Sequence, residues 1–369
     1  LYIAFKTLLF VIPLEINSST NFFLFPLCFG ESIKKIIFLT QLNICKFEIM
    51  IKVGIVGVGH LGEIHLKLIS NSKLFTLTGF YDNNRETAAL ISEKYNAISY
   101  SSHDDLCNDI DAVIICTPTL HHFETAKFFL SQNKHVFIEK PITTNLEQAN
   151  KLIELKNKNN LIGQVGHVER FNGAFMEVEN ILNPMFIESH RLSNYPARGT
   201  DVSVVLDLMI HDIDIVLSIV KSKVKYISAN GTKIISSSPD IANARIEFEN
   251  GCVANLTSSR LSLKKMRKMR VFQLDSYISI DFDKSKSEIV QINDYDKKNK
   301  YAMTLHNSEG IEKEIKIKTL ENLNVNSIIQ EHNDFASSIR TKNPPKVSFE
   351  TGRDALELAF KILNQIDSK

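Results

Sequence analysis

The segment that most constrains the fold is a glycine-rich turn between a short apolar run and a helical pattern. Residues 51–56 are mainly apolar, and a G-x-G-x-x-G arrangement follows them directly. Glycines at this spacing allow a tight turn, a close approach of the backbone to a pyrophosphate and close packing of helix on strand. The helix N-terminus adds N–H groups and partial positive charge. The segment therefore predicts a dinucleotide-binding site that contains Gly57, Gly59, His60, Leu61 and Gly62.

An acidic residue at the end of the second expected strand favours one form of the cofactor. Asp82 lies 20 residues after Gly62, where a carboxylate can accept hydrogen bonds from the ribose hydroxyls. The same carboxylate would repel a 2′-phosphate, which favours NAD over NADP. Arg85 is close enough in sequence to accommodate that phosphate, so NADP is not excluded.

Two kinds of hydrophobic pattern divide the rest of the chain. Apolar runs of strand length alternate with helical stretches up to about residue 170, which predicts a parallel sheet with crossover helices. Beyond it, residues 244–249 alternate apolar and polar, and Asn250 and Gly251 supply a tight turn, as in an antiparallel hairpin. Helical spacing returns at residues 326–339 and 352–366. We expect an α/β protein with a Rossmann domain at residues 50–170 and a second α/β domain at residues 171–369.

The first 49 residues differ from everything after them. They are rich in Phe, Leu and Ile, but charged residues and Pro26 keep each apolar run below the roughly 18 residues of a membrane-spanning helix. A signal peptide is an alternative, although no small-residue cleavage site follows the first apolar run. Met50 stands directly before the first expected strand. We expect residues 1–49 to be an extension outside the fold, an upstream mis-start, with the functional chain beginning at Met50.

Composition excludes several classes of protein. The formal net charge is +1, which offers no overall electrostatic attraction to nucleic acid or an anionic membrane. Five cysteines lie far apart with no C-x-x-C pair, so they define neither a disulfide framework nor a zinc site. We therefore expect a cytoplasmic protein with reduced thiols, no metal, and no nucleic-acid or membrane partner.

Two further polar motifs suggest acid–base chemistry. Glu139-Lys140-Pro141 ends an expected parallel strand, whose carboxyl end points toward the cofactor crevice. In the apolar helical segment 204–217, Asp207, His211 and Asp214 form one narrow stripe. A carboxylate one turn from an imidazole can fix its tautomer, which suits a base that removes a hydroxyl proton as hydride leaves the same carbon. The alternative is an ordinary amphipathic helix with its polar side in water. We predict that the catalytic residues are Lys140, Asp207 and His211.

The motifs at residues 57–62, 117–122, 134–141 and 207–212 occur in the order found in one known family. From Met50 onward the sequence resembles the Gfo/Idh/MocA family of NAD(P)-dependent oxidoreductases, which includes glucose-fructose oxidoreductase and inositol dehydrogenase. The resemblance implies a Rossmann domain followed by a domain with a large, open, mostly antiparallel sheet that mediates homodimers or homotetramers. It also implies that the His is the acid–base group, the Lys orients and polarises the hydroxyl, and the Asp supports them. The cofactor-side residues it implies are Thr117, Pro118, His122, Glu139 and Lys140.

Polar residues after the last Rossmann strand are candidates for substrate contacts, although each is equally suited to a structural hydrogen bond. The basic run at residues 264–270 is typical of a solvated strand face, but it would suit a diphosphate if it reached the cleft. These features resemble the branch of the family that oxidises UDP-N-acetylglucosamine at C3 in cell-envelope synthesis. The candidate substrate contacts are His167, Arg170, Asn172 and Arg198.

The function we predict is oxidation of a secondary hydroxyl of a sugar, cyclitol or nucleotide sugar by hydride transfer to nicotinamide. The complete set of Lys140, Asp207 and His211 favours an enzyme. An alternative from another class is a sensor protein that binds NAD(P) without turnover.

Overall fold

The computed structural model describes residues 50–195, 202–295, 303–306, 308–321 and 325–368. The expected extension at residues 1–49 lies outside these ranges. Within the described part, no helix is both long and apolar enough to cross a membrane.

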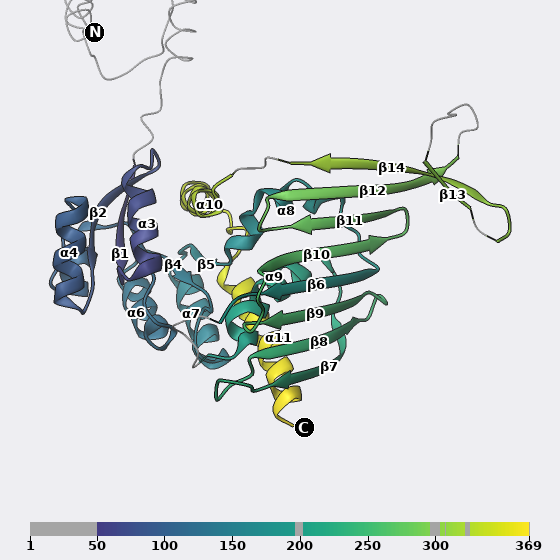
Figure 1. The fold of residues 1–369 in the computed structure, drawn as a ribbon. Coiled ribbons are helices and arrows are strands. Elements are labelled where there is room, and N and C mark those ends of the chain that lie inside the picture. Colours follow the sequence, from purple (N-terminus) through teal and green to yellow (C-terminus); the bar gives the residue numbers. More distant parts are fainter. Residues whose placement is uncertain (1–49, 196–201, 296–302, 307, 322–324, 369) are drawn as a thin grey trace, which may run out of the picture. The chain divides into compact units, whose positions relative to one another are not determined.

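The first half of the described chain forms a five-stranded parallel sheet in the order β2-β1-β3-β4-β5. The strands are short and largely apolar, and β3 and β5 are buried along their whole length. This arrangement confirms the parallel sheet predicted from the alternating pattern (Figure 1). The strands are β1 (Ile51–Val56), β2 (Phe75–Tyr81), β3 (Ala112–Ile115), β4 (His135–Glu139) and β5 (Gly163–Gly166), and the helices are α3 (His60–Ser70), α4 (Arg85–Tyr95), α5 (His103–Asp109), α6 (Thr119–Ser131) and α7 (Leu146–Lys158).

The second half is organised around a nine-stranded sheet in the order β13-β14-β12-β11-β10-β6-β9-β8-β7. Neighbouring strands in the described part are antiparallel except β6 and β9, which run parallel. The fold class predicted from the sequence is therefore confirmed. The strands are β6 (Phe186–Leu192), β7 (Val224–Thr232), β8 (Ile241–Phe248), β9 (Val253–Ser259), β10 (Met266–Gln273), β11 (Ser276–Asp281), β12 (Lys286–Asp294), β13 (Met303–His306) and β14 (Glu312–Leu320).

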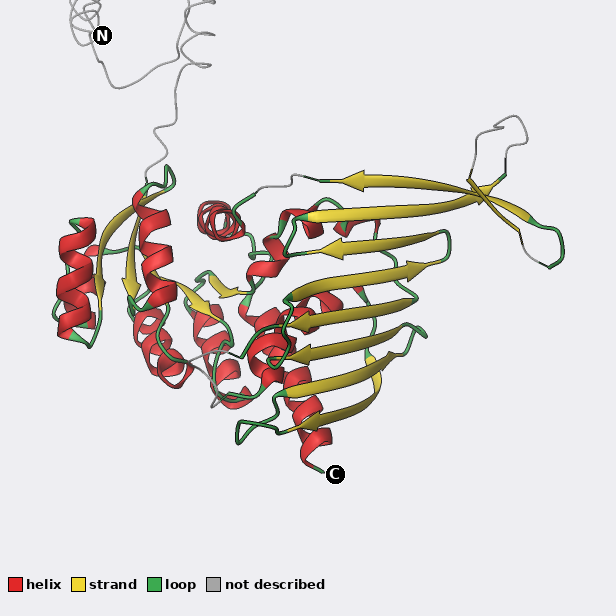
Figure 2. Ribbon diagram, viewed as in Figure 1, coloured by secondary structure: helices red, strands yellow, loops and turns green. Residues whose placement is uncertain are grey.

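Helices cover one face of this larger sheet. Inward-facing residues of the strands, such as Ala244, Leu256 and Val271, are buried against α9 (Ile210–Ile219) and α11 (Phe349–Asp367). Figure 2 shows helices surrounding the five-stranded sheet, while the β12–β14 end of the larger sheet extends past them. The remaining helical elements are η1 (Val168–Phe171), α8 (Gly173–Met176), η2 (Glu179–Ile181), η3 (Val205–Met209) and α10 (Ser327–Thr341).

The two closing helices begin close to their predicted positions because polar side chains cap them. The side chain of Asn326 accepts a hydrogen bond from the backbone N–H of Ile329 at the start of α10. At the start of α11, the side chain of Ser348 accepts one from the N–H of Thr351. Each cap satisfies a backbone donor that has no partner within its helix.

The segment expected to form one helix at residues 204–217 is instead two elements. Residues of η3 form a π-helical turn, and regular α-helix begins only at α9. Leu206 and Asp207 both donate backbone hydrogen bonds to the carbonyl of Ser203 at the start of this turn. A π-turn widens the helix locally and is frequent at functional sites. It occurs here at Asp207, directly before the helix that carries His211.

A buried ion pair in the larger sheet gives a test of its stability. Arg260 is 1% exposed, and its Nε donates to Oδ1 of the buried Asp240 at 2.8 Å. Arg260→Met should lower the free energy of unfolding by about 3–5 kcal/mol, because it leaves the Asp240 carboxylate buried without its counter-charge. Urea denaturation would measure the loss. The matched control is Arg245→Met, which breaks an exposed pair with Glu247 and should cost about 0.2–1 kcal/mol. Equal losses in the two variants would contradict this assignment.

Candidate active site

The glycine turn between β1 and α3 has the geometry that a pyrophosphate needs. Gly57 has φ +85°, and a Cβ there would lie 2.9 Å from the backbone N of Thr117. A Cβ on Gly62 would lie 1.9 Å from the carbonyl oxygen of Gly57, so helix and turn pack too closely for any side chain. At Gly59, by contrast, no atom lies within 4 Å of an added Cβ. Two glycines therefore shape the turn, and the third leaves open space beside it.

A cleft of about 630 Å³ lies beside this turn at the carboxyl ends of β1, β2 and β3. Asp82 faces it with an orientation fixed by two backbone donors: Val58 N–H bonds Oδ2 and Asn84 N–H bonds Oδ1, each at 2.8 Å. Arg85 is the first residue of α4, is exposed and does not line the cleft. The position of Asp82 fits a ribose rather than a 2′-phosphate.

The other predicted cofactor residues surround the same region. Thr117 and Pro118 line the cleft, whereas His60 lines a neighbouring hollow and Leu61 borders the cavity described next. His122 is 1% exposed, and its two ring nitrogens lie 2.9 Å and 2.8 Å from the carbonyl oxygens of Pro141 and Thr117. This histidine thus ties the turn after β3 to the turn after β4, a structural role.

A second cavity, of about 230 Å³, brings the predicted catalytic residues together. Lys140, at the end of β4, and His211, in the first turn of α9, both line it. The Nζ of Lys140 donates to Oδ1 of Asp207 at 3.0 Å and to the Asp207 carbonyl at 2.8 Å. Glu139 and Gly166 place the cavity at the carboxyl ends of β4 and β5, the same edge of the sheet as the glycine turn.

One detail of the expected geometry is wrong. The sequence suggested that the Asp207 carboxylate would hold the imidazole of His211, but it holds the Lys140 ammonium instead. Within the described residues, no hydrogen bond joins Asp207 to His211, and Nδ1 of His211 is buried without a protein partner. The π-turn at Asp207 changes the helical register on which the expectation depended.

The surroundings of His211 favour its neutral form. Burial, together with the positive charges of Lys140, Arg191 and Arg267, lowers the pKa of His211 well below its usual value. An imidazole with a lowered pKa is unprotonated near neutral pH and is free to accept a proton.

A buried ion network that the sequence analysis missed lies at the floor of this cavity. The Arg191 guanidinium bonds both carboxylate oxygens of Asp212, at 2.9 Å and 3.0 Å, and Oε1 of Glu169 at 2.6 Å. All three side chains are at least nine-tenths buried. The network joins β6, η1 and α9, and so fixes the helix that carries His211. Its residues are far apart in the sequence, and no local pattern pairs them.

A second buried network that the sequence analysis missed includes Glu139. Oε1 of this carboxylate is 2.9 Å from Nε2 of His65, and Nδ1 of His65 is 2.8 Å from Nε2 of His332. The neighbouring Glu331 is fully buried. The sequence of α10 did indicate buried polar residues here. Glu331 and His332 lie one turn before the buried Phe335 and Ala336, on what is otherwise the apolar face of the helix.

Two of the predicted substrate contacts have internal partners instead, and the third, His167, is buried. His167 is 1% exposed, Arg170 bonds Asp214 at 3.4 Å, and the side-chain amide of Asn172 donates to the carbonyl of Phe282 at 3.1 Å. None of the three lines the 230 Å³ cavity. Arg198 lies outside the described residues.

Two residues of the basic run are paired elsewhere on the larger sheet. Lys268 pairs with Asp281 at 3.2 Å, and Arg270 pairs with Glu188 at 3.6 Å. Arg267 differs because it lines the cavity, half-exposed, 3.6 Å from Glu169. It is the member of the run positioned to meet a substrate.

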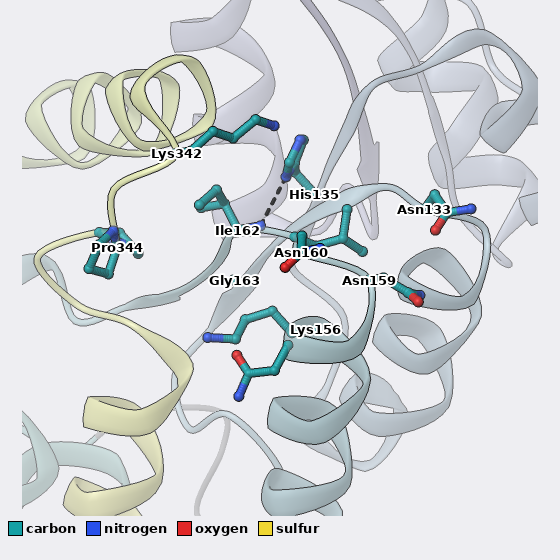
Figure 3. A pocket seen from close by; sticks show the side chains of 12 residues that line it. Asn133, His135, Lys156, Asn159, Asn160, Ile162, Gly163, Lys342 and Pro344 are labelled. Carbon is teal, nitrogen blue, oxygen red and sulfur yellow. Dashed lines mark hydrogen bonds between the residues drawn. The ribbon is translucent and has the colours of Figure 1, made fainter.

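A further cavity in the described part, of about 780 Å³, lies elsewhere (Figure 3). It is at the amino ends of β4 and β5, beside the C-terminal ends of α6, α7 and α10, and contains none of the predicted site residues. Lys156 and Lys342 complement the partial negative charge of the helix ends there. His135 accepts a hydrogen bond from the backbone N–H of Ile162, and burial lowers its pKa to about 4. These features have a structural explanation.

Metal ligands are not apparent at either site. In the ranges that the structure describes, no group of three or more His, Cys, Asp or Glu side chains is arranged to hold a metal ion. The arrangement at the catalytic cavity is instead a fixed ammonium beside a neutral imidazole, next to an open glycine turn.

Comparison with known proteins also indicates an NAD-binding oxidoreductase. A family model described as an oxidoreductase family with an NAD-binding Rossmann fold matches residues 51–167, and the model of the GFO/IDH/MocA C-terminal domain matches residues 159–274. The chain is 34% identical over 236 residues to UDP-N-acetylglucosamine 3-dehydrogenase of Acidithiobacillus ferrooxidans, covering 63% of this chain and 75% of the relative. It is 25% identical over 341 residues to myo-inositol 2-dehydrogenase of Thermotoga maritima, covering 86% and 97%.

The solved structure of the Acidithiobacillus enzyme, GnnA, superposes with a TM-score of 0.78 and 28% identity, covering 87% of this chain and 99% of that one. The glycine turn, the fixed Asp82 and the cleft beside them fit the NAD for which the matched family model is described. The chain therefore belongs to the Gfo/Idh/MocA family of oxidoreductases, with an NAD-binding Rossmann domain.

Proposed function

We propose that this oxidoreductase converts a secondary hydroxyl of a nucleotide-linked amino sugar to a ketone, with UDP-N-acetylglucosamine oxidised at C3 as the first substrate to test. The observation that carries the proposal is the convergence of Lys140, Asp207 and His211 at one cavity next to the glycine turn. The named activity of the Acidithiobacillus relative supports the choice of substrate.

In this mechanism the protein accepts one proton from the substrate and positions one hydroxyl oxygen. The glycine turn and Asp82 would hold NAD, which would supply the hydride acceptor. His211 accepts the hydroxyl proton, and its lowered pKa keeps it ready to do so. The Lys140 ammonium has three donors, of which two bond Asp207, so the third remains to hold the substrate oxygen. Asp207 therefore acts by orienting Lys140.

The charges around the cavity support a phosphorylated substrate over a neutral cyclitol. Arg267 stands at its edge with a half-exposed guanidinium, a group that binds phosphate bidentately. The myo-inositol dehydrogenase relative makes a free cyclitol the second candidate.

The separation of the two sheets supports a domain division near residue 170, between β5 and β6. A homodimer or homotetramer formed through the larger sheet, and a cytoplasmic location, remain predictions.

A substrate panel tests the proposal directly. With NAD in excess, UDP-N-acetylglucosamine should give NADH, whereas free N-acetylglucosamine should react at least about tenfold more slowly in kcat/KM because it lacks the diphosphate for Arg267. Absorbance of the reduced nicotinamide is the measurement. NADH formation from myo-inositol or free hexoses, with none from UDP-sugars, would refute the nucleotide-sugar assignment.

Removal of either catalytic side chain should abolish most turnover. We expect Lys140→Ala and His211→Ala each to lower kcat by about 100-fold or more, because each removes a group that holds or accepts the reacting proton. Steady-state kinetics with the active substrate gives kcat, and NADH fluorescence confirms that the cofactor still binds. Lys151→Ala and His306→Ala, at exposed positions, are the matched controls. Near-normal kcat in both active-site variants would rule out these roles.

Asp82 should determine the choice of cofactor. The wild type should favour NAD over NADP by roughly tenfold or more in kcat/KM, the equivalent of about 1.4 kcal/mol, because the carboxylate repels a 2′-phosphate. Asp82→Asn should reduce this preference, since the amide keeps the shape but loses the charge. Comparable kcat/KM for the two cofactors in the wild type would be evidence against the role of Asp82.

A further inference from the structure

Buried polar atoms without partners are concentrated behind the catalytic cavity. Among the described residues, twelve buried side-chain nitrogen or oxygen atoms have no hydrogen-bond partner in the protein, and eight of them belong to one cluster. A polar group that is buried and unsatisfied costs about 1–3 kcal/mol. Such a concentration in one place calls for an explanation. The cluster consists of Gln164, His167, Arg170, His211, Asp214 and Glu331.

Four elements meet at this cluster. The end of β5 and the following η1 supply Gln164, His167 and Arg170, α9 supplies His211 and Asp214, and α10 supplies Glu331. Both α9 and α10 pack directly on η1. The side-chain amide of Gln164 donates to the carbonyl of Glu331 at 3.0 Å, which links β5 to α10.

His167 lies beside the proposed catalytic base and interacts electrostatically with a buried carboxylate. Its ring centroid lies 6.1 Å from that of His211, with the two planes nearly perpendicular at 87°. Asp214 is the acidic group that acts most strongly on His167. One oxygen of Asp214 is bonded to Arg170, and the other is buried and unpaired. Both nitrogens of His167 and Nδ1 of His211 are also unpaired.

Unpaired nitrogen and oxygen atoms of this kind are the groups that bind ordered water inside proteins. Internal water molecules typically make two to four hydrogen bonds to otherwise unsatisfied buried groups. At a separation of 6.1 Å, the two rings are too far apart for a direct bond but close enough for one bridging molecule. Glu331 does not compete as a second buried anion, because burial and the nearby negative charges of Glu139, Asp334 and Asp214 raise its pKa well above the usual value.

We propose that His167 is a positioning residue that, through ordered water and together with Asp214, accepts a hydrogen bond from Nδ1–H of His211 and so fixes the tautomer of the catalytic base. With the proton held at Nδ1, the lone pair of Nε2 is free to take the hydroxyl proton of the substrate. When that proton arrives, the ring becomes an imidazolium, and the Asp214 carboxylate stabilises it through His167. The inference rests on the proposed base role of His211.

In this proposal His167 and Asp214 take the role that the sequence suggested for Asp207, which was to fix the tautomer of His211. The Asp207 carboxylate bonds Lys140, and within the described ranges no carboxylate is in hydrogen-bond contact with His211. The tautomer of a histidine is set by the hydrogen bond that its other ring nitrogen makes, so a base without such a partner is not held in the Nδ1–H form. His167 and Asp214 supply that preference from the buried side of the ring.

The test uses the tautomer as a readout that does not depend on turnover. Full-length protein labelled with 15N-histidine is examined at pH 7.5 by long-range 1H–15N correlation, with His211→Gln to assign the signal. In the wild type we expect the proton of His211 on Nδ1. In His167→Phe, which keeps an aromatic ring but removes both nitrogens, we expect a mixture of tautomers. His167→Gln, which retains a donor and an acceptor, should restore the Nδ1 form, and His306→Phe, at an exposed position, should change nothing.

Kinetics with UDP-N-acetylglucosamine and NAD provides the second arm. His167→Phe should lower kcat about tenfold while KM changes less than about twofold, because the lost interaction acts on the base rather than on substrate binding. A wild-type His211 with its proton on Nε2, or a His167→Phe variant that keeps the Nδ1 tautomer, would overturn the inference. If UDP-N-acetylglucosamine is not oxidised, the proposed substrate fails, while the tautomer measurement still decides the role of His167.

Discussion

The catalytic cavity depends on the buried guanidinium of Arg191. It bonds both oxygens of Asp212 and one oxygen of Glu169, and none of the three side chains is more than a tenth exposed. Two carboxylates and one guanidinium can be buried together only if each is paired, because an uncompensated charge in the interior costs several kcal/mol. The pairing therefore fixes α9 against β6 and η1. Since Asp212 adjoins His211, the same pairing also fixes the position of His211.

The cofactor half of the site could be predicted from the sequence because its determinants are local. One strand, one turn and one helix contain Gly57, Gly59 and Gly62, and the conformation of each glycine follows from steric limits that the spacing already expresses. Asp82 follows one strand later, and its position at the strand end is set by the same parallel sheet. Lys140 and His211 were also predicted, since polar residues in apolar surroundings stand out in the sequence.

The partners of these residues could not be predicted, because they are set by tertiary contacts. Asp207 was expected to serve His211 on the assumption of a regular helix, but a π-turn directs its carboxylate to Lys140. Glu169, Arg191 and Asp212 belong to separate elements, and nothing in their local sequences indicates that they meet. Glu331 and His332 could have been noticed, because they interrupt the apolar face of α10, but their contact with the Rossmann sheet required the structure.

The two halves of the site therefore differ in how strongly they depend on the whole fold. Binding of the cofactor relies on backbone N–H groups and open space at one turn, which a single strand–turn–helix unit can provide. In the proposed mechanism, proton handling relies on His211, whose lowered pKa comes from burial and from positive charges on residues in or next to β4, β6 and β10. A change in any of these elements alters the electrostatic environment of the base without touching the cofactor. Selection for a new substrate can thus act on the larger sheet, through residues such as Arg267, while the glycine turn stays the same.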